Sequence, residues 1–151
     1  MKGKDFLSIS DLNSGDIMRL ISSAIDIKAK GWSNLLSEKV LALLFEKPSL
    51  RHRASFEVAM RQLGGHCIYL SPAEVGLGQR ESVSDVARVL SGYVNCIAAR
   101  TFSHRTLETL ASYSSVPVIN ALSDREHPCQ ALADLLTIYE KKGELRGLSI
   151  A

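Results

Sequence analysis

Residues 40–70 read VLALLFEKPSLRHRASFEVAMRQLGGHCIYL, and this stretch decides the fold class. The apolar run 40–45 has the length and composition of a buried strand. In 51–63, apolar residues recur at three- and four-residue steps, which indicates a helix. Another short apolar run follows at 67–70. A strand, a helix and a second strand in succession favour a parallel sheet with the helix as crossover.

The same alternation continues along the chain. A further helix before the first strand covers 14–31, with Ser14 as its N-cap and Gly31 as its terminator. The remaining apolar and periodic segments predict strands at 95–100 and 116–120 and helices at 82–91, 104–114 and 127–142. We therefore predict an α/β fold, a doubly wound parallel sheet of about four strands flanked by helices. Ligands are expected at the carboxyl ends of its strands.

Composition narrows the class of protein. A chain of 151 residues with 46% hydrophobic and 23% charged residues suits one globular domain. The net charge of +2, with acidic residues interspersed among basic ones, argues against a nucleic-acid partner. No apolar run approaches the roughly 20 residues that span a bilayer, and the start lacks the apolar stretch of a secretion signal. We expect a cytoplasmic protein without a membrane partner.

Cysteine and histidine spacing argues against a metal site. Cys67, Cys96 and Cys129 are odd in number, lie far apart and form no CxxC pair, so a disulfide framework and zinc are both poor interpretations. Cys67 and Cys96 are expected in the core, and Cys129 is expected to be structural because no base accompanies it. No two histidines have metal-like spacing. His66 and His104 are interpreted as surface or capping residues.

The helix after the first strand predicts an anion site. Ser49 is a natural N-cap, so the backbone N–H groups of residues 50–53 are expected to face a ligand. A helix N-terminus favours an anion, and Arg51 adds a planar fork of donors. Arg53 is the lesser candidate because it can pair with Glu57 at i+4. The alternative is a solvated helix start, although two cations there oppose the helix dipole.

Two other strand ends offer polar groups to the same edge of the sheet. Arg100 ends the third expected strand, while His127 and Gln130 open the helix after the fourth. For Arg100 alone, the alternative interpretation is a charge at the rim of the sheet. For His127 alone, it is a residue that only starts a helix. Together with Arg51 they predict a phosphate site, at which the histidine and the glutamine suit a carbonyl and an amide.

Three segments resemble the aspartate/ornithine carbamoyltransferase family: FEKPSLRHRASFE (45–57), AARTFSH (98–104) and VPVINALSDREHPCQALADLLT (116–137). The first is similar to the family's Ser-Thr-Arg-Thr-Arg motif and the last to its His-Pro-x-Gln motif. The resemblance covers essentially the whole chain as the N-terminal, carbamoyl-phosphate-binding domain. The form His-Pro-Cys-Gln, with Phe-Glu-Lys-Pro ahead of the first motif, looks like the ornithine-specific branch. The aspartate-specific branch more often has His-Pro-Thr-Gln.

The resemblance implies carbamoyl transfer from carbamoyl phosphate to the δ-amine of ornithine, giving citrulline and phosphate without a cofactor or a metal. It further implies arginine biosynthesis and a homotrimer or a multiple of it. Of the site residues, it gives catalytic roles to Arg51, Arg100 and His127. The residues that it places at the substrate are Ser49, Leu50 through its backbone, Arg51, His52, Arg100, His127 and Gln130.

The chain departs from the family pattern at three positions. Leu50 and His52 stand where the motif has threonines, and Gly76 stands where relatives often carry a glutamine. That glutamine belongs to the loop 76–82, which in relatives reaches a neighbouring subunit. His52 exchanges a small hydroxyl for a bulkier ring, which can donate to the phosphate or crowd it.

The resemblance also sets the expected domain boundary. Residues 1–147 would form the carbamoyl-phosphate-binding domain, and residues 148–151 would begin a truncated ornithine-binding domain, so the fragment alone is expected to be inactive. Two alternatives stay open. One is a non-catalytic module for phosphate or a phosphorylated metabolite, which explains the arginines but not His127 and Gln130. The other is a carbamoyltransferase with a different acceptor, such as aspartate.

Overall fold

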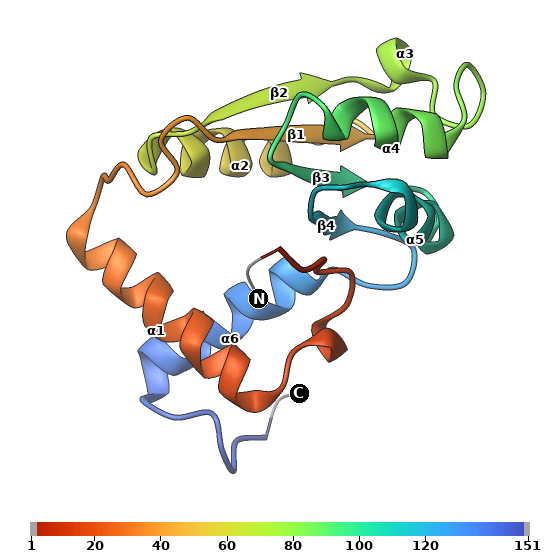
Figure 1. Ribbon diagram of the computed structural model, residues 1–151. Helices are drawn as coiled ribbons and strands as arrows, with labels where there is room; N and C mark the ends of the chain where they lie inside the picture. The colour runs from red at the N-terminus through yellow and green to blue at the C-terminus, as the bar shows by residue number, and fades with distance from the viewer. Residues whose placement is uncertain (1–2, 150–151) are drawn as a thin grey trace.

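A four-stranded parallel sheet forms the centre of the computed structural model, which describes residues 3–149 (Figure 1). Its spatial order is β2-β1-β3-β4, and every neighbouring pair is parallel. The strands are β1 (Val40–Phe45), β2 (His66–Leu70), β3 (Cys96–Arg100) and β4 (Val118–Leu122). The predicted α/β fold class is thereby confirmed. The expected strand start at 148–151 lies partly outside the described residues.

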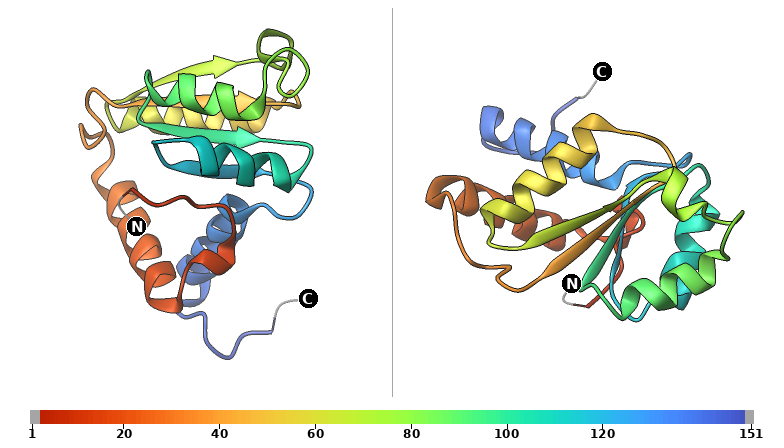
Figure 2. Two further views of the ribbon diagram at one scale, coloured as in Figure 1. Left: turned by 45° about the vertical axis from the view of Figure 1, so that its right-hand side comes forward. Right: turned by 90° about the horizontal axis from the view of Figure 1, so that it is seen from above.

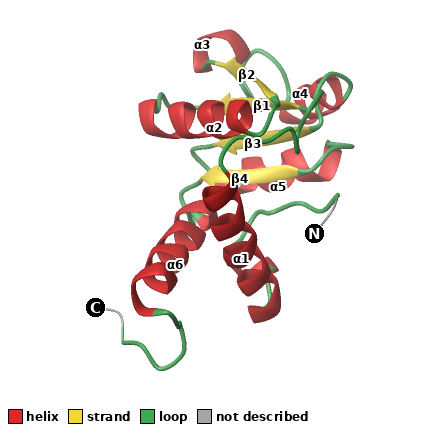
Figure 3. Ribbon diagram, turned by 90° about the vertical axis from the view of Figure 1, so that its left-hand side faces the viewer, coloured by secondary structure: helices red, strands yellow, loops and turns green. Residues whose placement is uncertain are grey.

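Helices lie on both faces of the sheet (Figures 1 and 2). One face carries α2, while α4 and α5 lie side by side on the other. Near β4, α1 and α6 extend away from the sheet and contact each other (Figure 3). The helices are α1 (Ser14–Lys30), α2 (Leu50–Gln62), α3 (Pro72–Val75), α4 (Val83–Ser91), α5 (His104–Tyr113) and α6 (Pro128–Lys142), and a 3-10 helix, η1, spans Ile9–Asp11.

The central strand β1 shows why its apolar run is continuous. Successive side chains of a strand point to opposite faces. Ala42 and Leu44 therefore pack in the core beneath α4 and α5, whereas Leu43 and Phe45 pack on the α2 side with Met60. Because helices cover both faces of this strand, neither face is exposed to solvent, which explains the continuous apolar run VLALLF.

The order of the strands creates a topological switch point between β1 and β3. From β1 the chain crosses to β2 on one side through α2, and it later returns to β3 on the other side through α4. Helices on opposite faces diverge at such a point and leave a crevice at the carboxyl ends of the strands. The Glu46 N–H donates to the Arg100 carbonyl at 2.8 Å and joins the two strand ends. The predicted site residues come from this edge.

The N-cap predicted for α1 was wrong by one residue. Asn13, not Ser14, caps the helix: its side chain accepts from the Asp16 N–H at 2.9 Å, and the Asp16 carboxylate reaches back to the Asn13 N–H. This reciprocal pair satisfies two backbone donors, which favours the earlier start. The terminator was predicted correctly, because Gly31 is the C-cap with φ of 74°.

The segment 71–82, between β2 and α4, contains a short helix, α3. The Ser71 N–H is bound by the Glu74 carboxylate at 2.8 Å, and Pro72 occupies the first helical position. The helix ends at Gly76, which has φ of 51° in the left-handed region. A Cβ at Gly76 would lie 2.9 Å from the Cβ of Arg80. Glycine is therefore favoured over residues with a side chain at this position.

Candidate anion-binding site

The N-terminus of α2 has the features that attract an anion. Ser49 is its N-cap, as predicted, and the Ser49 Oγ accepts from the His52 N–H at 3.4 Å. No acidic residue lies in the first turn, so no carboxylate of this helix competes for the remaining N–H groups. Leu50 is 84% exposed, and its side chain packs against little of the chain. The local field favours negative charge.

Arg53 turns away from this end of the helix. Its Nε donates to Glu57 Oε1 at 2.8 Å, and its guanidinium lies 4.2 Å from the centre of the Tyr69 ring. The predicted i,i+4 pair is confirmed. Arg51 forms no comparable ion pair among the residues that the structure describes. The two arginines of the first turn therefore have different environments, and Arg51 is the one available to a ligand.

Arg100 brings a second guanidinium to the same edge. It is half-buried at the end of β3, and its Nη1 lies 3.3 Å from His52 Nδ1. Its Nε is buried and has no hydrogen-bond partner among the described residues. An unsatisfied buried donor on a cation costs free energy, and an anion with several acceptor oxygens would satisfy it.

His127 is brought from α6 to meet His52. It is the N-cap of α6, where its Nδ1 accepts from the Gln130 N–H at 3.3 Å. On the other side of the ring, His127 Nε2 lies 2.8 Å from His52 Nε2. The ring centres are 4.9 Å apart and the ring planes differ by 28°. The first turns of α2 and α6 therefore meet through two imidazoles.

Both histidines have lowered pKa values. The pKa of His52 is lowered first by burial, and then by the nearby His127 and the positive Arg100. Burial also lowers the pKa of His127, where Arg100 acts in the same direction and Asp134 opposes it. The neutral form of each ring is favoured, because charging either one would add a cation beside Arg100.

A buried polar cluster fixes the loop that carries His127. Asn120 is fully buried, and its Nδ2 donates to the Leu7 carbonyl at 2.9 Å and to the Glu126 carbonyl at 3.3 Å. The Ser123 hydroxyl lies 2.9 Å from His104 Nδ1. These bonds hold both the start and the end of the segment before α6. The sequence interpretation missed Asn120, although a single amide in the apolar run VPVIN was an available signal.

His104 was predicted incorrectly as a surface or capping residue. It is 8% exposed, and its backbone N–H donates to Asp124 at 2.7 Å. The cap of α5 is Ser103. The prediction failed because the polar partners of His104 lie 19 and 20 residues further along the chain. His66 is exposed, as expected.

A cavity of about 600 Å³ lies between α2 and α6. Four predicted site residues line it: Arg51, His52, His127 and Gln130. The Gln130 side chain donates to Asp134 at 2.8 Å and is exposed. Arg100 does not line this cavity but contacts His52 from the strand side. The site thus gathers groups from three strand ends.

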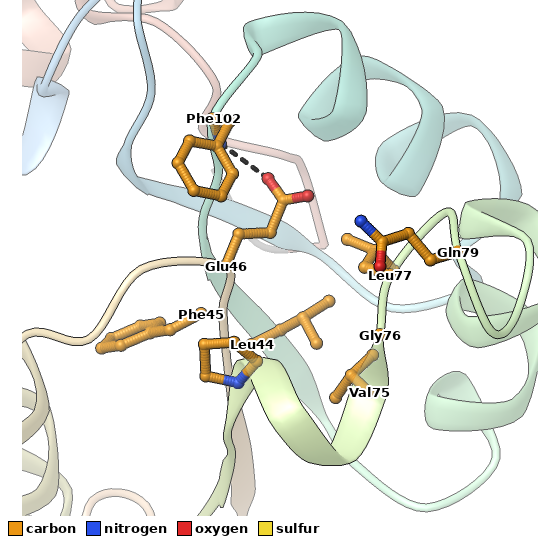
Figure 4. Close-up of a pocket in the computed structure, with 9 residues that line it drawn as sticks. Leu44, Phe45, Glu46, Val75, Gly76, Leu77, Gln79 and Phe102 are labelled. Carbon is orange, nitrogen blue, oxygen red and sulfur yellow. Dashed lines mark hydrogen bonds between the residues drawn. The ribbon is translucent and has the colours of Figure 1, made fainter.

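A second, smaller cavity of about 210 Å³ lies on the other side of the β1 end (Figure 4). It is lined by the β1 end, Phe102 and the segment that includes Gly76 and Gln79. Glu46 accepts from the Phe102 N–H at 2.6 Å, which ties the carboxylate to one wall. None of the arginines or histidines predicted at the site lines it. This cavity is therefore distinct from the one between α2 and α6.

The cysteines have structural surroundings. The Cys129 thiol donates to the Asn120 carbonyl at 3.5 Å, and burial raises its pKa to about 11, which disfavours the thiolate. Cys67 and Cys96 are half-buried against the core. Within residues 3–149, no group of three histidine, cysteine, aspartate or glutamate side chains is placed to hold a metal ion. No described helix is long and apolar enough to cross a membrane.

Comparison of the sequence with protein families gives one match. The profile described as "Aspartate/ornithine carbamoyltransferase, carbamoyl-P binding domain" matches residues 4–140. The ornithine carbamoyltransferase of Anoxybacillus flavithermus is 52% identical over 155 residues, which cover 100% of this chain and 49% of the relative. The chain spans about half the length of the curated relatives it matches.

Solved structures agree with the fold. The ornithine carbamoyltransferase from Thermus thermophilus has a TM-score of 0.91 and 52% identity, over 95% of this chain and 50% of that chain. An N-acetyl-L-ornithine transcarbamylase mutant, complexed with carbamyl phosphate and N-succinyl-L-norvaline, has a TM-score of 0.85 and 36% identity. That match covers 93% of this chain and 48% of the other. Both are similar to this chain throughout the sheet and its helices.

Proposed function

This chain belongs to the aspartate/ornithine carbamoyltransferase family, as its carbamoyl-P binding domain, and from that premise we propose that it binds carbamoyl phosphate for transfer to ornithine. The observation that carries the proposal is the meeting of three anion-binding features at one switch point. These are the N-terminus of α2, which has no acidic residue in its first turn, Arg51 beside it, and Arg100 with its unsatisfied Nε. A phosphate supplies the acceptors that all three lack.

The phosphate would be bound mainly by backbone and guanidinium donors. Ser49 and the N–H groups at the start of α2 would donate to its oxygens, with Leu50 taking part through its backbone. Arg51 and Arg100 would neutralise the charge that grows on the phosphate as it leaves. His52 adjoins both the N-cap and Arg100, so it would contact the same oxygens.

The carbamoyl group would face α6. His127 and Arg100 would stabilise negative charge that develops on its carbonyl oxygen, and Gln130 would orient its amide. For that role the Gln130 side chain must exchange its bond to Asp134 for one to the substrate. The cavity lined by His127 and Gln130 supports this placement.

The reaction would be a direct substitution at the carbamoyl carbon. The neutral δ-amine of ornithine forms the new C–N bond, the bond from carbon to the phosphate oxygen breaks, and the departing phosphate takes up the proton that the amine loses. The products are citrulline and phosphate, and the step needs no cofactor. We place ornithine outside the carbamoyl-phosphate-binding domain, for which we propose the extent 1–147.

The family resemblance also supports a homotrimer or a multiple of it, a role in arginine biosynthesis and a cytoplasmic location. In such a trimer the loop 76–82 would approach a neighbouring subunit. Gly76 has no side chain to offer there, but Gln79 and Arg80 in the same loop are exposed. Light scattering in solution tests the assembly: a trimer or its multiple is expected, and a monomer would contradict it.

Calorimetry with a matched pair of arginine variants tests the function. Arg51→Ala should abolish detectable binding of carbamoyl phosphate, because a charge-assisted pair to phosphate is lost. Arg53→Ala, in the same helical turn but paired with Glu57, should bind as the unsubstituted chain does. Unchanged binding by Arg51→Ala would refute the assignment. Binding without turnover by the natural full-length protein would favour the non-catalytic module instead, and turnover with aspartate would favour the other acceptor.

A further inference from the structure

The contact between His52 and His127 requires one hydrogen to be shared between two nitrogens. The Nε2 atoms lie 2.8 Å apart, which is hydrogen-bond distance. A neutral imidazole carries hydrogen on one nitrogen only. One Nε2 must therefore donate and the other must accept, since two donors or two acceptors would repel each other at this separation.

The contacts around the two rings are compatible with either direction of this hydrogen bond. The Gln130 N–H lies 3.3 Å from His127 Nδ1, but it also donates to the His127 carbonyl at 3.0 Å. On the other ring, His52 Nδ1 lies 2.6 Å from the Ser49 Oγ and 3.3 Å from Arg100 Nη1. A single chain of contacts runs from the α6 backbone through both rings to the α2 N-cap.

Among the described residues, the Arg100 side chain has one possible acceptor, His52 Nδ1, which lies 3.3 Å from its Nη1. Its Nε is buried without a partner among the described residues. Arg51 lines the same cavity as the two histidines. The carboxylate of Asp134 is exposed and accepts from the Gln130 side chain. The charged groups facing the pair are thus mainly donors.

We propose that His52, besides its place at the anion site, positions His127, and that the pair takes up one proton when a dianion binds. The neutral pair carries two ring hydrogens on four nitrogens, and one of them lies in the contact between the Nε2 atoms. An added proton places a second positive charge beside Arg100, and an anion at the N-terminus of α2 would offset that charge.

Electrostatics gives the direction of the coupling. Burial, Arg100 and the facing ring lower the pKa of His52 below its usual 6.5, so the pair is mainly neutral at pH 7. A dianion beside the ring favours the imidazolium and raises that pKa. At a pH between the pKa of the free pair and that of the pair beside the anion, binding therefore takes up a proton, and the affinity for the anion rises as pH falls. The inference rests on the proposed function, because it concerns the same anion site.

Sulfate is the suitable probe, because it remains a dianion over the pH range in which phosphate itself titrates. Calorimetric titration of the 151-residue chain with sulfate should show affinity rising roughly tenfold from pH 7.5 to pH 6.0. Repeating the titration at pH 6.5 in buffers of different ionisation enthalpy should show an uptake approaching one proton per bound anion. This measurement needs no variant, so it does not depend on how any substitution folds.

Two variants assign the proton to the pair. His52→Gln can still form a hydrogen bond with His127 Nε2 but cannot be protonated, so it should bind sulfate with little pH dependence and little proton uptake. His66→Gln, an exposed histidine on β2, should behave like the unsubstituted chain. Sulfate binding without proton uptake by the unsubstituted chain would overturn this inference and leave the proposed function intact. If the chain bound neither sulfate nor carbamoyl phosphate at any pH, both this inference and the proposed function would be overturned.

Discussion

Arg100 Nη1 lies 3.3 Å from His52 Nδ1, although the two residues are 48 positions apart in the sequence. The contact follows from the register of the sheet. Phe45, the last residue of β1, pairs with Arg100, the last residue of β3, and α2 begins a few residues after β1. The side chain that ends one strand therefore reaches the helix that follows its neighbour. An anion at this point would meet a helix N-terminus and a guanidinium together.

Replacement of Arg100 by lysine should show whether phosphate binding depends on the planar shape of the guanidinium or only on its positive charge. Lysine keeps the positive charge but loses the planar fork and the buried Nε. Arg100→Lys should weaken binding of carbamoyl phosphate at least about tenfold, and Arg100→Ala should weaken it further, as measured by calorimetry. Arg105→Ala, an exposed arginine on α5, is the matched control. Equal affinity of Arg100→Lys and the unsubstituted chain would contradict the fork as the reason for arginine.

Phosphate should protect the chain against thermal unfolding. A ligand that binds only the folded state stabilises it by about 2.7 kcal/mol at a hundredfold excess over its Kd. The rise in Tm should be larger at low ionic strength, where screening is weaker. Arg51→Ala should lose most of this rise, and Arg53→Ala should retain it. A protection independent of salt would argue against an electrostatic anion site.

Asn120→Ala should destabilise the chain by about 1–3 kcal/mol in urea unfolding, because the partly buried carbonyls of Leu7 and Glu126 lose their donor. Ser112→Ala, at an exposed position on α5, should change little. The loop before His127 should also loosen, so carbamoyl phosphate should bind more weakly. A stable variant with unchanged affinity would show that Asn120 does not position His127.

The free energy of unfolding should fall as pH decreases below 6.5. His52 and His127 have lowered pKa values in the folded chain, so between those values and 6.5 the unfolded chain binds more protons. Stability from these two groups is therefore complete above pH 6.5 and is lost on acidification. His52→Gln should show a shallower fall between pH 7 and pH 5.5 than His66→Gln. Identical slopes would contradict a perturbed His52.

Most of the sheet could be predicted because β1, β3 and β4 are largely buried, whereas the edge strand β2 is not. VLALLF needs no partner to be identified as a central strand, and β1 has the predicted bounds. The bounds of β4 were less accurate, since it starts at Val118 and ends at Leu122 rather than spanning 116–120. Its pairing with β3 is irregular between Ala99 and Arg100, and such a register shift has no local sequence signal.

The site could be predicted in part for a topological reason. Carboxyl ends of parallel strands lie at one edge, so residues such as Arg51, Arg100 and His127 were expected to converge. The direct bond between His52 and His127 could not be foreseen, because it depends on how the first turns of α2 and α6 face each other. The burial of His104 likewise depends on a hydroxyl contributed by a distant loop.

A crystal structure of this chain with carbamoyl phosphate would show directly where the anion binds. We predict the phosphate at the N-terminus of α2, with its oxygens accepting from Arg51 and Arg100 and with the carbamoyl group against His127. A phosphate bound elsewhere, for example in the smaller cavity beside Glu46 and Gln79, with the two arginines turned to solvent, would contradict it.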